Sequence, residues 1–160
     1  MSNLLGLNED QPNAPIEADA FLAARVVKNG ANWFYWIAAL SVINSVSFAL
    51  GSTVTFLAGL GLTIVMDVLA NAAIAGGAPE ALLLVALAFN FVLCGGFALL
   101  AYYAGNGSKA AFIVGTVVYL LDAGIVLLIG DLFSAAFHGF ALFFIIRGLL
   151  NLRHLQPQPA

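Results

Sequence analysis

Residues 110–152 read AAFIVGTVVYLLDAGIVLLIGDLFSAAFHGFALFFIIRGLLNL, and this stretch decides the fold. Two apolar runs, 110–129 and 132–152, meet at Gly130 and Asp131. Each run has about the length of ~20 residues that an α-helix needs to cross a bilayer. Unbroken apolarity indicates helices, because the strands of a membrane barrel would alternate apolar and polar residues. The short connection therefore predicts an antiparallel pair of membrane helices.

Each run of this hairpin carries one ionisable side chain well inside it, Asp122 in the first and His138 in the second. At a rise of ~1.5 Å per residue, both residues lie ~11–13 Å from the turn. Helices that run antiparallel bring residues at equal distances from their turn to the same level. The hairpin therefore predicts a hydrogen-bonded carboxylate–imidazole pair, provided that both side chains face inward.

The composition of the whole chain indicates a membrane protein. Of its 160 residues 62% are hydrophobic and 8% are charged, and the mean hydropathy is +1.03. A soluble domain carries about a quarter charged residues, which it needs to face water. The net charge of −3 argues against nucleic acid as a partner, since phosphate binding needs clustered cations. The lipid bilayer is the expected partner.

Three further apolar runs precede the hairpin, at residues 32–50, 54–75 and 81–104. We therefore expect an all-α, polytopic membrane bundle of about five transmembrane helices over residues 31–152. An odd number of spans places the start and the end of the chain on opposite sides. The alternative is four spans plus a re-entrant or interfacial hairpin, because five spans leave lysine and arginine nearly balanced between the two sides.

The segments outside the bundle have a different character. We expect residues 1–15 to form a flexible N-terminal tail, since they are rich in Asn, Pro and acidic residues. Residues 16–30 have an apolar and a charged face, which predicts a short amphipathic helix at the membrane surface that ends at Asn29 and Gly30. Residues 153–160 form a C-terminal tail.

Aromatic residues mark the expected membrane interfaces. Tryptophan and tyrosine prefer the headgroup region, where the ring is buried and its polar edge stays wet. Trp33, Tyr35 and Trp36 are expected to anchor the start of the first span. Tyr102 and Tyr103 are expected to mark the opposite interface, at the end of the third span.

Four polar residues fall at one level in the five-span arrangement. Counted from the side of the Gly130 turn, Asp67, Asn90, Asp122 and His138 all lie at ~11–15 Å depth by the helical rise. Two acids, an amide and a histidine at one level fit a proton relay, a cation site or a metal site. The same residues also fit a structural hydrogen-bond cluster that holds the bundle together. Both interpretations stay open at this point.

Motifs for catalysis or cofactor binding are absent from the sequence. It contains no HExxH, and a haem held by two histidines needs a second buried histidine beside His138. We therefore expect no enzyme activity and no cofactor. The first functional expectation is an accessory or scaffold subunit of a membrane assembly, working as a homo-oligomer or with other membrane subunits. The second is a small carrier or channel for protons, cations or a small solute.

One stretch resembles a known group of proteins. Residues 32–61 run from Asn-Trp-Phe-Tyr-Trp-Ile-Ala through Val-Ile-Asn-Ser-Val to Gly-Leu-Gly. This stretch is similar to a group of uncharacterised small bacterial membrane proteins. The resemblance implies a multi-pass protein of the bacterial inner (cytoplasmic) membrane, and it implies no activity.

Overall fold

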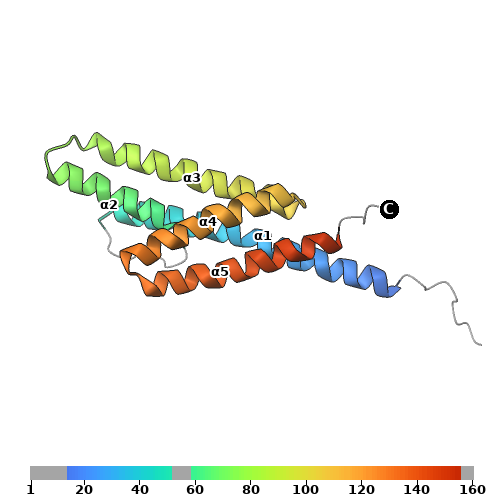
Figure 1. Ribbon diagram of the computed structural model, residues 1–160. Coiled ribbons are helices and arrows are strands. Elements are labelled where there is room, and N and C mark those ends of the chain that lie inside the picture. Colours follow the sequence, from blue (N-terminus) through green and yellow to red (C-terminus); the bar gives the residue numbers. More distant parts are fainter. Residues whose placement is uncertain (1–13, 52–58, 156–160) are drawn as a thin grey trace, which may run out of the picture.

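The computed structural model describes residues 14–51 and 59–155. Their helices, in chain order, are α1 (Ala14–Ala49), α2 (Gly61–Ala75), α3 (Ala81–Gly105), α4 (Lys109–Ile129), α5 (Leu132–Asn151) and the short 3-10 helix η1 (Leu152–His154) (Figure 1). These residues contain no strand, so the all-α prediction is confirmed. Three of the helices, α3, α4 and α5, are long and apolar enough to cross a membrane.

Contacts along the helices give their directions. Gly30 of α1 lies against Gly148 of α5, and Trp33, further along α1, lies against Phe140, which is earlier in α5, so these two helices run antiparallel. Helices α3, α4 and α5 alternate in direction (Figure 1). The bundle thus has two ends. We call the end where α3 and α5 finish and α4 begins the basic end, and the end with the α2–α3 and α4–α5 connections the turn end.

Helix α1 passes straight through the point where the sequence predicted a helix end. The prediction of a separate helix over residues 16–30 is wrong, because α1 is one helix of 36 residues. Gly30 does not end the helix; it lets α1 approach α5. A Cβ atom at Gly30 would lie 2.8 Å from Gly148 Cα and 2.9 Å from the Phe144 carbonyl oxygen. The first half of α1 extends beyond the rest of the bundle at the basic end (Figure 1).

Helix α2 differs most from its prediction, which placed a full span at residues 54–75. It has 15 residues and begins at Gly61; residues 52–58 lie outside the described part of the chain. Leu60 lies beside the last third of α1, because its backbone N–H donates to Ser41 Oγ at 2.6 Å. From there α2 runs parallel to α1 towards the turn end (Figure 1).

This parallel pair changes the topology expected from five antiparallel spans. The start of α1 and the end of α5 both lie at the basic end, not at opposite ends (Figure 1). Tyr102 and Tyr103 are likewise at the same end as Trp33, because α3 finishes beside Ala31 of α1. The prediction of opposite interfaces for these aromatic residues is therefore wrong.

The core of the bundle at the basic end is a layer of aromatic side chains. Phe34 of α1 lies 6.1 Å from Phe97 of α3 and 6.0 Å from Phe112 of α4, measured between ring centroids. Phe97 in turn lies 6.3 Å from Tyr119. All four side chains are at most 2% exposed. Gly115 makes room for the layer, since a Cβ atom there would meet the Phe34 ring at 2.6 Å.

The close contact of α1 with α5 predicts the effect of adding one methyl group. Gly30→Ala places a Cβ atom against the backbone of α5, which has no flexible side chain to move away. We expect a loss of ~1–3 kcal/mol, which is typical of overpacking. Thermal unfolding in detergent measures it. Gly95→Ala on α3 is the matched control, because its Cβ would meet nothing within 4 Å. Equal melting temperatures for both variants would contradict the close packing.

Candidate functional site

The site is built around the start of α2, which lies inside the bundle. The first N–H groups of a helix have no partner within the helix. Here they bond to side chains from other helices: Leu60 N–H to Ser41 Oγ, and the next two to Asp122. Gly61 N–H donates to Asp122 Oδ2 and Leu62 N–H to Asp122 Oδ1, both at 2.8 Å. Asp122 of α4 therefore caps α2, a partner 61 residues away along the chain.

The structure brings Asp122 and His138 together, as the hairpin predicts. His138 Nε2 lies 3.0 Å from Asp122 Oδ2, and the two side chains are 1% and 4% exposed. Gly130, with φ of 87°, ends α4 in the left-handed conformation, and Asp131 begins the next helix. This tight turn sets the two antiparallel helices in register, so the residues on either side of it come level.

The other ring nitrogen of His138 fixes where its proton lies. His138 Nδ1 is 2.8 Å from the backbone carbonyl oxygen of Ser134. A carbonyl oxygen can only accept a hydrogen bond, so Nδ1 must carry a proton. The Nε2–Oδ2 contact needs a second proton, which belongs either to the imidazole or to the carboxyl group. The geometry thus calls for one proton shared between Asp122 and His138.

Tyr119 separates this pair from the basic end of the bundle. Its ring stacks on the His138 imidazole, with centroids 4.6 Å apart and planes inclined by 16°. The opposite neighbour of Tyr119 is Phe97, part of the aromatic layer described above. On this side the pair is therefore covered by buried rings.

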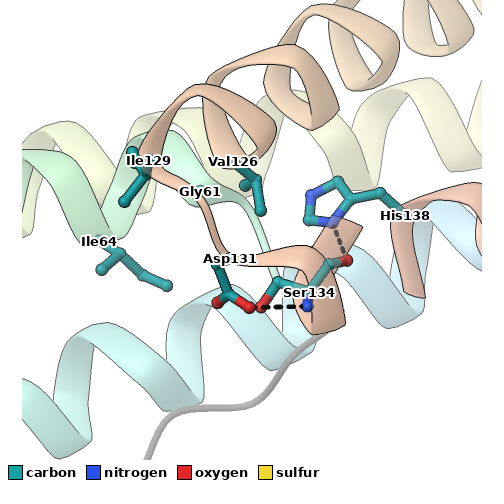
Figure 2. Close-up of a pocket in the computed structure, with 8 residues that line it drawn as sticks. Gly61, Ile64, Val126, Ile129, Asp131, Ser134 and His138 are labelled. Carbon is teal, nitrogen blue, oxygen red and sulfur yellow. Dashed lines mark hydrogen bonds between the residues drawn. The ribbon is translucent and has the colours of Figure 1, made fainter. Parts of the chain in front are cut away.

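On the other side, a cavity of about 80 Å³ reaches the imidazole of His138 from the turn end. Figure 2 shows Asp131 at the α4–α5 turn, Ser134 beside it, and His138 further in. Ile64 and Gly61 of α2 line the cavity too. A buried water needs at least ~10–15 Å³ of such space, so the cavity has room for a few water molecules. Most of the lining is apolar, and its polar side chains are the exposed Asp131, Ser134 and the buried His138.

Asp67 and Asn90 belong to a separate cluster, so the prediction of four residues at one level is wrong. Asn90 Nδ2 donates to Asp67 Oδ1 and to Ser45 Oγ, each at 2.8 Å. Asp67 lies six residues after Gly61, which is ~9 Å further along α2. The Asn90 amide oxygen is buried with no hydrogen-bond partner in the described structure. This cluster joins α1, α2 and α3, while Asp122 and His138 join α2, α4 and α5.

The candidate metal site is not supported by the arrangement of ligands. Among the described residues, no group of three or more His, Cys, Asp or Glu side chains could hold a metal ion. The membrane-interface role expected of five aromatic residues stays a prediction, and their exposure differs. Tyr35, Trp36, Tyr102 and Tyr103 are 43–61% exposed. Trp33 instead packs on α5, stacked on Phe144 with centroids 5.4 Å apart.

Sequence reasoning missed Ser41 and Ser134 as members of the site. Ser41 acts through its hydroxyl group, which accepts from Leu60 N–H and donates to the Ile37 carbonyl oxygen at 2.8 Å. Ser134 acts through its backbone carbonyl, which any residue type supplies. A serine in an apolar run is a weak signal for Ser41, and no side-chain signal exists for Ser134.

Asp131 has a structural role at the start of α5. Its Oδ1 accepts from the Ser134 backbone N–H at 3.0 Å, as an N-cap residue does. This hydrogen bond from the Ser134 backbone holds the pKa of the Asp131 carboxyl below its usual value of 3.8. The ionised carboxylate at the rim of the cavity is thereby favoured.

A comparison with protein-family models, with curated proteins and with solved structures finds no match to this chain. The resemblance of residues 32–61 to uncharacterised bacterial membrane proteins therefore stays a prediction.

Removing one partner of the buried pair should cost more than replacing both with amides. His138→Leu leaves Asp122 without its imidazole partner, and an uncompensated buried charge costs about 3–5 kcal/mol. In the double variant Asp122→Asn with His138→Gln, an amide oxygen can still accept from α2 and a side-chain bond can still form. We expect the lower melting temperature in detergent for His138→Leu. Phe133→Leu, at an exposed site on the same helix, is the control. Equal stability of all variants would show that the pair contributes nothing.

The Asp131 cap predicts a pH-dependent contribution to stability. Asp131→Ala removes the acceptor for Ser134 N–H, and loss of an N-cap costs about 1 kcal/mol. Because the folded pKa lies below 3.8, the contribution is fully present above pH 3.8 and disappears as the pH falls through the folded pKa. Melting curves of both proteins should therefore differ at pH 7 and converge in acid. A difference that grows in acid would be the wrong sign and would refute the cap.

Proposed function

We propose that the protein is a multi-pass integral membrane protein whose basic end lies in the cytoplasm. The supporting observation is the distribution of lysine and arginine between the two ends of the bundle. The chain has five lysine and arginine residues, and the helices that carry them place all five at the basic end: Arg25, Lys28, Lys109, Arg147 and Arg153. The turn end has Glu80 and Asp131 instead. Cytoplasmic loops of membrane proteins carry an excess of lysine and arginine, which sets their orientation.

The course of the helices supports four crossings. Besides α3, α4 and α5, which cross in alternate directions, the proposal takes α1 as a fourth span: it is less apolar than those three but has 36 residues. Helix α2 starts inside the bundle and leaves at the turn end. This corresponds to four spans plus a re-entrant element, the alternative that the balance of charges left open. We assign the protein to the inner membrane of a bacterium, which is what the resemblance of residues 32–61 implies.

Within that membrane, the function that we propose is a non-enzymatic accessory or scaffold subunit. Two observations support it: the buried polar side chains bond to the protein itself, and the exposed helix faces are apolar. Ser41, Asn90, Asp122 and His138 bond to groups of the protein's own helices. The outer surface is rich in large apolar side chains, and only 22% of an 18-residue apolar stretch of α3 is buried. A large apolar helix face remains for lipid or for other membrane helices.

Small residues on α3 suit such a helix partner. Gly95 and Gly96 are exposed, and a Cβ atom at either position would meet nothing within 4 Å. Exposed glycines allow the backbone of a second helix to approach closely. The partner is a second copy of this chain or another membrane subunit.

Purification in a mild detergent tests the scaffold proposal. We expect an oligomer or a stably co-purifying membrane protein, and we expect Gly95→Leu to weaken that association by blocking the close approach. Gly139→Leu is the matched control, since Gly139 is an exposed glycine on α5 with open space around it. A lone monomer without a co-purifying chain would count against the scaffold.

The orientation is tested by labelling single cysteines. The chain has one native cysteine, Cys94, so the variants are made in a Cys94→Ala background. Glu80→Cys lies at the turn end and Asn106→Cys in the α3–α4 connection at the basic end. In intact cells stripped of any outer membrane, a membrane-impermeant maleimide should label Glu80→Cys at once and Asn106→Cys only after permeabilisation. The reverse pattern, or labelling of both from one side, would contradict the proposed orientation.

A second candidate function, a small carrier or channel for protons, cations or a small solute, is favoured by the cavity beside His138. Proteoliposomes with a pH gradient or an ion gradient test it. We expect flux that is lost in His138→Gln. Absence of flux across a panel of ions and pH gradients would eliminate this candidate.

A further inference from the structure

The hydrogen bonds around His138 and Asp122 define how many protons the pair can hold. His138 Nδ1 donates to the Ser134 carbonyl oxygen, and Nε2 shares a proton with Asp122 Oδ2. With that shared proton, the pair has no net charge, whichever of the two residues carries it. Without the proton, the pair has a charge of −1, and one of the two imidazole contacts loses its hydrogen.

Helix α2 makes this second state accessible. Two backbone N–H groups, from Gly61 and Leu62, donate to the Asp122 oxygens. They lie at the N-terminus of the helix, where the macrodipole is positive and favours a negative charge. The carboxylate therefore keeps two partners when the shared proton leaves. The site can hold a proton and can also lose it.

The surroundings favour proton exchange on the His138 side of the pair, where the cavity has polar side chains in its lining. Towards the turn end, the cavity brings water-sized space to the imidazole. Towards the basic end, the stacked ring of Tyr119 and the rings of Phe97, Phe34 and Phe112 cover the pair, each at most 2% exposed. A second cavity, of about 260 Å³, reaches Asp122 between α2, α3 and α4, but its other lining side chains are all apolar and offer water no hydrogen-bond partner: Leu60, Leu62, Leu93, Phe97, Val118, Leu121 and Ile125. The space beside His138 and the exposed Asp131 at its rim therefore lie on the turn-end side of the pair.

The ionisable groups around the pair are few. From α4 the imidazole faces Asp122 and Tyr119, and from the turn it faces Asp131 across the cavity. Helix α2 presents its backbone N–H groups, while its own Asp67 bonds to Asn90 instead. Among the described residues of α1 and α3, the ionisable side chain buried within the bundle is the thiol of Cys94. The charge of the site is thus decided by the pair itself.

We propose that Asp122 and His138 form a proton-binding site that exchanges protons with the turn end and takes no metal cation. The inference narrows the carrier proposal to one ion, and it holds for a scaffold protein too, because binding a proton requires no transport. A metal ion would meet a carboxylate already held by the positive N-terminus of α2. It would also lack a third ligand, since no metal-ligating group of three is present in the described residues.

Nitrogen-15 NMR of histidine in lipid bilayers tests the bound proton directly. The chain has two histidines, so His154→Gln leaves His138 as the single reporter. At pH 7 we expect a protonated Nδ1 and an Nε2 signal shifted towards the protonated form, and one proton should be lost as the pH rises. In Asp122→Asn the amide donates to Nε2, so the ring should already be in the neutral Nδ1–H form. A bare Nδ1 at pH 7, or spectra of the two proteins that are identical at every pH, would overturn the inference.

Two further measurements test the ion and the side of exchange. Addition of Zn²⁺ should leave the His138 signals unchanged, and a specific shift would mean that the site takes a metal.

The side of exchange is tested by thiol labelling. In a Cys94→Ala background, Ser134→Cys in the cavity wall should react with a charged, impermeant thiol reagent added at the turn end. Ala141→Cys, one turn beyond His138 and fully buried, is the matched control and should not react. Reaction of Ser134→Cys from the basic end would overturn one-sided exchange.

The outcomes separate this inference from the proposed functions. A bound, exchangeable proton without flux in proteoliposomes supports the site and removes the carrier. Loss of association in detergent removes the scaffold and leaves the site intact. A neutral His138 with a bare Nδ1 overturns the site, whatever the flux or association.

Discussion

The bundle depends on how the first N–H groups of α2 are satisfied. A helix that starts inside an apolar bundle cannot leave its N–H groups to water, and each unsatisfied group would cost several kcal/mol in hydrocarbon. The residue before the helix, Leu60, has no polar side chain to act as a cap. Ser41 of α1 and Asp122 of α4 supply the acceptors instead. Asp122 therefore links α4 to two other helices: to α2 through two N–H groups and to α5 through His138.

This capping also explains why glycine occupies position 61. A Cβ atom at Gly61 would collide with the Val126 side chain, four residues after Asp122 on the same helix. The backbone of α2 must come close to α4 for both carboxylate oxygens to reach N–H groups. Packing and hydrogen bonding thus impose the same requirement at this point. The second polar cluster also joins three helices through one side chain. The Asn90 amide of α3 donates to Asp67 of α2 and to Ser45 of α1.

The sequence predicted those parts of the fold that depend on local pattern. The runs at 81–104, 110–129 and 132–152 form helices with nearly the expected bounds, because each lies between turn-forming residues and is apolar throughout. The same periodicity and the short turn placed Asp122 opposite His138. The direction of α2 could not be predicted, since it is fixed by acceptors on other helices, one of them 61 residues away. Gly30 was misinterpreted for the same reason: glycine is a weak helix terminator, and only the contact with Gly148 shows why it is there.

The corrected direction of α2 also changes what the charges mean. In five antiparallel spans, the five basic residues divide between the two sides and give no orientation. With α1 and α2 parallel, every lysine and arginine falls at one end, and the opposite end has only acidic residues among its charged groups in the described structure. The cavity that leads to His138 opens at this acidic end, beside Asp131. A negative rim attracts cations, hydronium among them, while the aromatic layer around Phe34 closes the way to the basic end. The direction of this one helix therefore underlies both the orientation that we propose in the membrane and the side from which we propose that the buried pair is reached.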